Sequence, residues 1–319
     1  MRASPATRDG ARCVWAPAPA KLNLGLRITG RRTDGTHELE SLFVPLDLAD
    51  RVAVEVSAAG APLVSFALDR EAQGAVGEVP ADRSNLAARA AERFLDAAGL
   101  VCAVKIRLTK CIPVAAGLGG GSSDAGAVLR ALADLFPGAL EPAALARLAR
   151  GLGADVPFFL DPRPALVRGI GERIEPLSGL PALSLLLANP GIPLPTAEVY
   201  RAFDALGACP SAPAGGEAAA RLRPLLGGGR DAAPDPAFFR ALNRLLENDL
   251  EPAALRLCPP VARLRERLRA AGAAAIGMSG SGPTVFGAFE DPSSARAALE
   301  RAAFEPPIWA RVAAVLESR

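Results

Sequence analysis

The sequence predicts an α+β protein made of two domains. Its 319 residues are enough for two domains of ~150 residues each, with ample apolar sequence for a core. Short strand-like runs alternate with helix-like runs along the whole chain. A glycine-rich loop, PVAAGLGGGSS at 113–123, separates a strand pattern from a helix pattern, and no internal repeat of fixed period accompanies this order.

The first half of the chain opens with strands. Branched apolar residues bounded by turn residues predict strands over 13–16, 24–29, 51–56 and 63–68. Ser84 is expected to cap a helix that ends at Gly99. Strict alternation then predicts a strand over 101–109, and helices are expected over about 123–136 and 141–153.

The second half changes in texture after residue 164. A hairpin is expected around Gly169 and Gly171, and a buried strand over 181–191. A connection rich in Pro, Ala and Gly over 206–236 is expected to be irregular, with one short helix. The remaining patterns predict two helices over 236–247 and 259–271, and then a pair of strands around a glycine turn over 273–289. A last helix is expected over 293–304 and a last strand over 309–317.

Composition excludes several classes of protein. The net charge of +2 gives no electrostatic case for binding nucleic acid or an acidic membrane. The first residues lack the apolar core of a signal peptide, and no apolar run is long enough to span a bilayer, so a cytoplasmic location is expected. Unpatterned cysteines favour reduced thiols over a disulfide framework or a zinc site: Cys13, Cys102, Cys111, Cys209 and Cys258.

The glycine loop predicts a phosphate-binding site. Residues without a Cβ atom allow backbone N–H groups to converge on an anion. The helix that follows adds free N–H donors and the positive end of its dipole. A flexible glycine linker is the alternative, but linkers are bordered by polar, low-complexity sequence, and this loop is bordered by two strongly patterned runs.

The loop is neither of the two commonest phosphate loops. A Walker A loop needs a lysine after its last glycine, whereas Ser122, Ser123 and Asp124 follow Gly121. A dinucleotide-binding fingerprint needs a third glycine where Ser122 stands. A different class of nucleotide site is therefore expected.

Lysine and histidine are rare in this chain. Among 36 basic residues only Lys21, Lys105 and Lys110 are lysine, and His37 is the single histidine. A lysine kept in such a chain indicates a position that needs a compact ammonium, although chance survival is the alternative for each. A Ser-His-Asp or Cys-His centre would have to use His37, and the zinc motif H-E-x-x-H fails at Ser41.

Four motifs together identify the chain as similar to the GHMP kinase superfamily. They are PAKLNL at 19–24, the glycine loop at 113–123, LGADVP at 152–157 and GMSGSGPT at 277–284. The resemblance implies a two-domain GHMP kinase fold, with an N-terminal ribosomal-protein-S5-like nucleotide-binding domain and a C-terminal ferredoxin-like domain separated by a cleft. We expect these domains to cover residues 1–163 and 164–319.

The resemblance is strongest to one branch of the superfamily. The triple-glycine form GLGGGSSDAG and the run LGADVPFF are typical of the branch that phosphorylates the 2-hydroxyl of 4-diphosphocytidyl-2-C-methyl-D-erythritol. That reaction belongs to the non-mevalonate (MEP) route to isoprenoid and terpenoid precursors. The resemblance implies an ATP-dependent kinase that uses Mg²⁺, binds a small cytidyl substrate and exists as a monomer or weak homodimer, without nucleic-acid or membrane partners.

The resemblance also assigns catalytic roles. Phosphoryl transfer asks a protein mainly for positioning and charge stabilisation, with a group to accept the proton of the attacking hydroxyl. Asp155 is the expected base, and a turn aspartate is its structural alternative. Lys21 is the expected charge stabiliser and Asn23, on the same face of its strand, is expected to orient the pair or the substrate.

Further residues are expected to frame ATP. Asn85 and Lys110 match nucleotide-framing positions, with a helix-start residue and a strand-end charge as their structural alternatives. The loop itself is expected to hold the β and γ phosphates through its backbone. Its residues are Pro113, Val114, Ala115, Ala116, Gly117, Leu118, Gly119, Gly120, Gly121, Ser122 and Ser123. Ser122 or Ser123 is a candidate Mg²⁺ ligand.

The substrate side carries one departure from the family motif DGYHEL. Thr36 stands where the family has a tyrosine that stacks on the cytosine, and the loss of one stacked wall would cost ~1–3 kcal/mol. His37 is expected to bond the edge of the base, or else to be a structural histidine. Tyr200, the only tyrosine, is expected to form the second wall. Gly280 and Ser281, in a turn implied to lie against the phosphate loop, complete the substrate residues, although an ordinary hairpin turn is the alternative.

Three functions stay open at this point. The first is the cytidyl-substrate kinase, which transfers the phosphoryl group directly without a phosphoenzyme. The second is a GHMP-type kinase for another small alcohol, favoured by Thr36. The third is a non-catalytic nucleotide-binding module, which would have no need of both Lys21 and Asp155.

Overall fold

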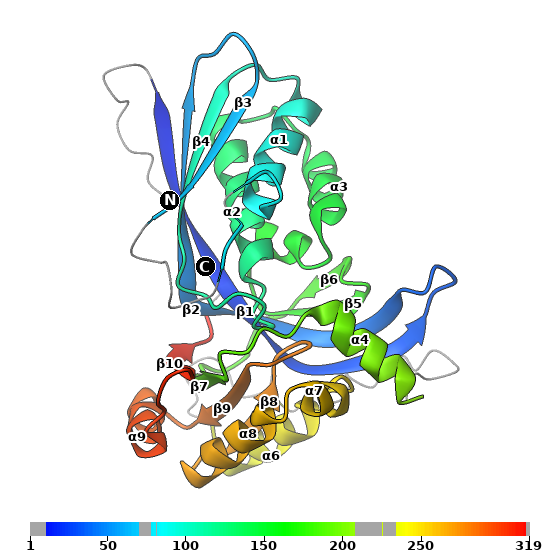
Figure 1. The fold of residues 1–319 in the computed structure, drawn as a ribbon, viewed down its shortest axis with the longest axis vertical. Coiled ribbons are helices and arrows are strands. Elements are labelled where there is room, and N and C mark those ends of the chain that lie inside the picture. Colours follow the sequence, from blue (N-terminus) through cyan, green and yellow to red (C-terminus); the bar gives the residue numbers. More distant parts are fainter. Residues whose placement is uncertain (1–10, 70–77, 81, 208–224, 226–233, 317–319) are drawn as a thin grey trace. The chain divides into compact units, whose positions relative to one another are not determined.

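A computed structural model describes residues 11–69, 78–80, 82–207, 225 and 234–316 (Figure 1). The chain forms two compact units, and both are assembled from separated stretches. The first unit comprises Met1–Ala20, Leu48–Val114 and Gly119–Pro162, and the second comprises Lys21–Asp47, Ala115–Leu118 and Arg163–Arg319. The contiguous division expected from the sequence differs from these units, because residues 21–47, 115–118 and 163 lie with the second unit.

The sheet of the first unit runs in the order β3-β4-β2, and β1 also pairs with β2. Its strands are the first part of β1 (Arg12–Arg31), the last part of β2 (His37–Ser57), β3 (Leu63–Leu68) and β4 (Ala103–Thr109). β4 lies parallel to β3 and antiparallel to β2. Its Val104, Ile106 and Leu108 are buried while Lys105 and Arg107 between them are exposed, which confirms the predicted alternation.

Three helices cover one face of this sheet (Figure 1). They are α1 (Leu86–Ala98), α2 (Gly120–Leu135) and α3 (Pro142–Leu152). α2 lies in the middle of the core, and its residues from Ser123 to Leu129 are all buried. The predicted cap of α1 is wrong by one residue: Asn85, not Ser84, has the extended backbone, and its side chain accepts from the N–H of Ala87.

The second unit contains two sets of paired strands. The first part of β2 pairs antiparallel with β5 (Ala165–Gly169), which pairs antiparallel with β6 (Arg173–Pro176). β5 and β6 form the hairpin expected around Gly169 and Gly171.

The other sheet of the second unit has four antiparallel strands in the order β10-β7-β9-β8. The strands are β7 (Ser184–Asn189), β8 (Ala275–Met278), β9 (Val285–Phe289) and β10 (Trp309–Ala314). Helices separate β7 from β8 and β9 from β10, so the chain follows the β-α-β-β-α-β order of ferredoxin-like domains. This confirms the fold implied for the C-terminal half.

The described residues of the second unit also form five helices: α4 (Thr196–Ala205), α6 (Pro236–Leu245), α7 (Glu251–Leu257), α8 (Pro260–Ala270) and α9 (Pro292–Ala302). Apolar side chains of α8 and α9 share a core with β7 and β9, including Leu186, Leu264 and Phe289. α6, α8 and α9 match predicted helices, whereas α4 and α7 were not expected. The connection predicted over 206–236 lies mostly outside the described residues.

The two longest strands were predicted only in pieces. β1 joins the predicted strands over 13–16 and 24–29, and β2 begins at His37 instead of at 51. Pro17 and Pro19 lie inside β1, where their missing N–H groups indicated a break. Among the described residues, no helix combines the length and the apolar character needed to cross a membrane.

Candidate active site

The glycine loop leads directly into the first turn of α2. Ala115, Gly117 and Gly119 all have positive φ angles, of 51°, 74° and 71°. Gly119 is the N-cap of α2 and makes no side-chain hydrogen bond, so the first N–H groups of the helix are left for a ligand. The N-terminus of α2, in the first unit, is therefore suited to an anion.

Three of the four sequence motifs meet in the second unit. The N–H of Lys21 donates to the carbonyl of Leu118 (2.9 Å), which joins β1 to the loop. Ser279 Oγ donates to the carbonyl of Gly117 (2.9 Å) and accepts from the N–H of Asn23 (3.2 Å). A Cβ on Gly117 would lie 2.4 Å from the carbonyl oxygen of Ser279, so only glycine permits this contact. The turn at 277–284 thus lies against loop residues 115–118.

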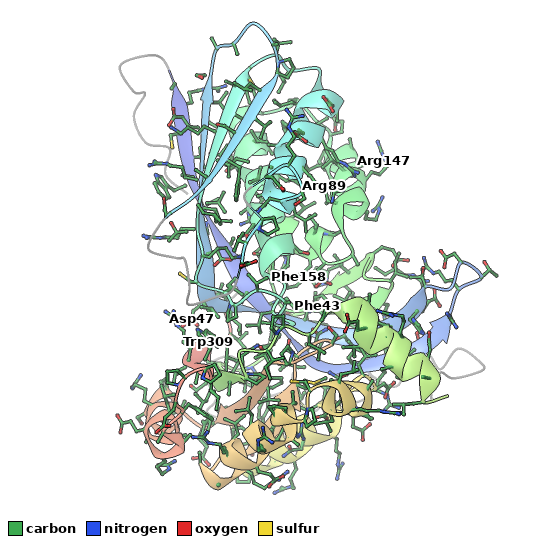
Figure 2. All side chains as sticks on the ribbon, in the orientation of Figure 1. Phe43, Asp47, Arg89, Arg147, Phe158 and Trp309 are labelled. Carbon is green, nitrogen blue, oxygen red and sulfur yellow. The ribbon has the colours of Figure 1, made fainter. Side chains whose placement is uncertain are left out.

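Lys21 is a buried lysine held in place by its neighbours. Its Nζ donates to Oδ1 of Asn23 and lies 4.5 Å from the centre of the Phe43 ring, which is labelled in Figure 2. Asn23 is itself fixed, because its Nδ2 donates to Ser41 Oγ (2.9 Å). The expectation that Lys21 and Asn23 share a face of one strand is confirmed. The ammonium is oriented by an amide and an aromatic face, as a fixed positive charge in a site requires.

Gly280 lies beside this lysine. A Cβ at Gly280 would be 3.1 Å from Asn23 Oδ1 and 3.6 Å from Lys21 Nζ, so the turn approaches both side chains closely. Asn248 fixes the turn, since its Nδ2 donates to the carbonyls of Met278 (3.0 Å) and Gly280 (2.8 Å). The next residue, Ser281, shares a hydrogen bond with Thr196 Oγ1 at the start of α4 (2.9 Å).

In the first unit, Asp155 stands directly before η2 (Val156–Leu160), a short 3-10 helix. Asp155 is half-buried, and its side chain does not cap that turn. η2 lies against α2 at Gly126, where an added Cβ would be 2.5 Å from the Cβ of Phe159. The same segment approaches the loop, because a Cβ on Gly153 would be 4.0 Å from Ser122 Oγ. Asp155 therefore comes from a turn fixed beside the first turn of α2.

Lys110 lies in a cluster that we call the buried triad, formed by Asp50, Lys110 and Asp124. All three side chains are at most 4% exposed. Lys110 Nζ donates to Asp50 and to Asp124 (2.8 Å). Asp50 Oδ1 also accepts the N–H groups of Cys111 and Ile112 (2.9 Å to Ile112), which are the residues just before the loop.

The electrostatics of the buried triad follow from its burial. Burial, together with the nearby charge of Asp50, raises the pKa of Asp124 to about 7 against the attraction of Lys110. Burial alone would lower the pKa of Lys110, but the two carboxylates hold it above its ordinary value. Lys110 Nζ lies 3.2 Å from the position of a Cβ on Gly120. The triad therefore holds the Lys110 ammonium beside Gly120 of the loop.

Asn85 and the serines of the loop complete the nucleotide side. Asn85 caps α1 and donates from Nδ2 to the carbonyl of Pro80 (2.8 Å), so its side-chain contacts are those of a helix cap. Ser122 is half-buried, while Ser123 Oγ is fully buried without a hydrogen-bond partner among the described residues. An orphan hydroxyl at the N-terminus of α2 is unusual in a folded protein and indicates a place for a ligand.

The predicted substrate residues His37 and Tyr200 also lie together, in the second unit. Their ring centres are 5.0 Å apart, and the ring centre of Phe203 lies 5.9 Å from that of His37, with the two planes at 77°. Thr36 is exposed in the turn between β1 and β2, where its N–H donates to Asp34 Oδ1 (2.9 Å). Next to it, His37 Nε2 lies 2.7 Å from Asp204 Oδ1.

Several residues of these sites were missed from the sequence, namely Ser41, Asp50, Asp124, Asp204 and Asn248. All but Asp124 lack a local signal, because their side chains are common in turns and on surfaces and the partners described above are 18 to 167 positions away in the chain. Only Asp124 had a local signal, because it directly follows the serines of the loop.

Comparisons with known proteins agree with this geometry. Residues 85–161 match the GHMP kinases N terminal domain, and residues 236–307 match the GHMP kinases C terminal domain. A relative from Thermus thermophilus, named 4-diphosphocytidyl-2-C-methyl-D-erythritol kinase, is 44% identical over 290 residues, covering 89% of this chain and 90% of its own length.

Solved structures give the same result. A crystal structure of 4-(cytidine 5'-diphospho)-2C-methyl-D-erythritol kinase is 40% identical with a TM-score of 0.73, covering 95% of this chain and 100% of that one. A homoserine kinase from Cytophaga hutchinsonii, 19% identical, shares the fold with a TM-score of 0.68, over 99% of this chain and 98% of its own. The chain therefore belongs to the 4-diphosphocytidyl-2-C-methyl-D-erythritol kinase family of the GHMP kinases.

Proposed function

We propose that this protein is an ATP-dependent kinase that phosphorylates the 2-hydroxyl of 4-diphosphocytidyl-2-C-methyl-D-erythritol. The meeting of Lys21 with loop residues 115–118 and the turn at 277–284 is the single observation that supports it most directly. The backbone N–H of Lys21 bonds to the phosphate loop, and its side chain is a buried, oriented ammonium. This combination suits phosphoryl transfer, in which the protein supplies positioning and positive charge.

The loop is proposed to hold the β and γ phosphates of ATP. Positive φ angles at Gly117 and Gly119 turn the backbone, and the uncapped start of α2 presents its N–H groups. Because α2 is buried along most of its length, these donors are held rigidly. The side chains of Asn85 and Lys110 already bond to protein groups. They would therefore frame the nucleotide indirectly, Asn85 by fixing the start of α1 and Lys110 by fixing the base of the loop.

Asp155 is the proposed base and Lys21 the proposed charge stabiliser. Asp155 would accept the proton of the 2-hydroxyl as its oxygen attacks the γ-phosphorus, with ADP as the leaving group. Lys21 would favour the ionised carboxylate and balance the charge that develops on the oxygens. Asp155 belongs to the first unit and Lys21 to the second, so their pairing in the reaction is part of the proposal.

The residues present fit a magnesium ion held largely by ATP. Mg²⁺ is usually bound through few protein ligands together with substrate phosphates. Among the described residues, no group of three or more His, Cys, Asp or Glu side chains is placed to hold a metal, while the orphan Ser123 Oγ and half-buried Ser122 lie at the start of α2. Ser122 or Ser123 would hold the ion, which when bound neutralises charge on the phosphates.

The cytidine end of the substrate is assigned to His37 and Tyr200. An aromatic ring beside a histidine offers a stacking face and a hydrogen-bonding edge to one base. The exposed Thr36 supplies no second aromatic wall, and this observation favours a kinase for another small alcohol as the alternative. A cytoplasmic location and a monomer or weak homodimer complete the proposal.

A substrate panel tests the function. Purified protein with ATP and Mg²⁺ is expected to release ADP with 4-diphosphocytidyl-2-C-methyl-D-erythritol, and not with homoserine or mevalonate. Turnover of another alcohol alone would support the alternative kinase. ATP binding without turnover on any alcohol would indicate a non-catalytic module.

The role of Asp155 has its own test. Asp155→Asn is expected to lower kcat at least about 100-fold while the Kd of ATP changes little, because the amide keeps the shape but cannot accept the proton. Asp96→Asn, an exposed aspartate on α1, is the matched control and should keep normal kcat. Near-normal kcat in Asp155→Asn would show that the base is another group.

A further inference from the structure

Asp204 on α4 connects two residues of the turn region that lacks the family tyrosine. Its Oδ1 lies 2.7 Å from His37 Nε2, and its Oδ2 lies 3.4 Å from a terminal nitrogen of Arg31. The His37 side chain is 8% exposed, whereas Asp204 and Arg31 are 28% and 51% exposed. We call Arg31, His37 and Asp204 the base array.

The base array is held from both sides. Arg31 donates from Nε to the carbonyl of Gly35 (3.0 Å), so its guanidinium lies along the turn between β1 and β2. The ring of His37 is flanked by Tyr200 and Phe203. Because one carboxylate oxygen faces Arg31 and the other faces His37, neither the carboxylate nor the imidazole is free to choose another orientation.

This arrangement fixes which nitrogen of His37 carries a proton. A carboxylate only accepts hydrogen bonds, so Nε2 must be the donating nitrogen. In the neutral ring, Nδ1 is then a bare acceptor. No hydrogen bond to Nδ1 occurs among the described residues, which leaves this acceptor for a ligand.

We propose that Asp204 is a specificity-determining positioning residue, which acts through His37 to select cytosine over uracil. The inference rests on the proposed function. Cytosine presents an exocyclic amino group, a donor that pairs with a bare Nδ1, whereas uracil presents an acceptor oxygen at the same position. A site built to accept a hydrogen bond rejects a base that cannot donate one.

The single histidine makes the first test unambiguous. In protein labelled with ¹⁵N-histidine, every imidazole signal arises from His37. In its neutral form the wild-type imidazole is expected to be the Nε2–H tautomer, and that of Asp204→Ala a mixture of both tautomers. Addition of cytidine diphosphate should shift the Nδ1 signal more than uridine diphosphate does. An Nδ1–H tautomer in the wild type would overturn the inference without any activity measurement.

The second test compares kcat/KM for the cytidyl substrate and its uridine analogue. Asp204→Ala is expected to reduce the preference for cytosine at least about tenfold, chiefly through a higher KM with little change in kcat, because the base lies away from the transferred group. Glu198→Ala, at an exposed acid on the same helix, is the matched control and should keep the wild-type preference.

The outcomes separate this inference from the proposed function. If wild type phosphorylates the cytidyl substrate but Asp204→Ala keeps the full preference, Asp204 has no role in choosing the base. If kcat falls while the preference stays, Asp204 is only structural and the inference is again wrong. No turnover of the cytidyl substrate by wild type would instead refute the proposed function, and the inference with it.

Discussion

Two charged clusters in this protein differ mainly in their access to water. The buried triad, in the first unit, has side chains that are at most 4% exposed. The base array, in the second unit, has two of its three side chains more than a quarter exposed. The triad places an ammonium between two carboxylates in a low-dielectric core, whereas the base array places a carboxylate between Arg31 and His37 at the surface.

The difference assigns the clusters different tasks. A buried charge that loses its partner has no water to replace it, so the triad is coupled to the stability of the unit and of the loop above it. A partly exposed pair is screened and contributes little to stability. The base array can therefore be changed with small structural cost, which suits a cluster that determines a preference between ligands.

Lys110→Met gives the largest expected effect. It leaves Asp50 and Asp124 buried without their cation, which is expected to lower the free energy of unfolding by ~3–5 kcal/mol. Urea unfolding at neutral pH measures the change. Lys105→Met, an exposed lysine on the neighbouring strand β4, serves as control and should change it by less than about 0.5 kcal/mol. A loss below about 1 kcal/mol in Lys110→Met would contradict the account of the triad.

Alanine substitutions at Gly117 and Gly120 compare the steric demands at two positions of the loop. Gly117→Ala forces a side chain into a positive φ of 74° and to 2.4 Å from a carbonyl oxygen, with an expected cost of ~1–3 kcal/mol and a large loss of turnover. Gly120→Ala has no such φ, and its Cβ would meet Lys110 and Ile112 at 3.1–3.2 Å. Thermal unfolding should give Gly117→Ala the lower midpoint temperature of the two variants. The opposite order would show that the tighter contact is not at Gly117.

The pH dependence of stability follows from Asp124. Its folded pKa of about 7 lies above the unfolded value, so between these values the folded state holds a proton that the unfolded state has lost. The free energy of unfolding therefore falls as pH rises from about 4 to about 7, by at most ~1.4 kcal/mol per pH unit. Asp124→Asn should flatten this decline in urea titrations, whereas parallel curves for the two proteins would show that Asp124 does not titrate in this range.

The base array gives the smallest effect on stability. Asp204→Ala removes two partly exposed interactions and is expected to lower the free energy of unfolding by less than ~1 kcal/mol. The same urea titration measures it, with Glu198→Ala as the control on α4. A loss comparable to that of Lys110→Met would remove the contrast between the clusters.

The sequence predicted local features well. The loop, the helix after it and the alternating strand β4 each depend on neighbouring residues, so the pattern of side chains was sufficient. The closeness of His37 and Tyr200 was accessible only through the resemblance, because 163 positions separate them. Where prolines interrupt β1, local propensity predicted two strands and the pairing with β2 produced one.

The charged clusters could not be predicted in the same way. Asp50 directly precedes the strand predicted over 51–56 and looks like an ordinary strand-end aspartate, but Lys110, 60 positions later, makes it a buried partner. Asp204 looks like a solvated residue of a short helix until His37 is placed beside it. Such pairs depend on tertiary contacts, and a single sequence carries no local pattern for them.

The most direct test of the proposed function is to identify the product by ³¹P NMR. The protein is incubated with ATP, Mg²⁺ and 4-diphosphocytidyl-2-C-methyl-D-erythritol, and the spectrum is followed over time. We predict equal amounts of ADP and of a new phosphomonoester, coupled to the 2-position of the methylerythritol. ADP accompanied only by inorganic phosphate, or an unchanged spectrum, would contradict the account.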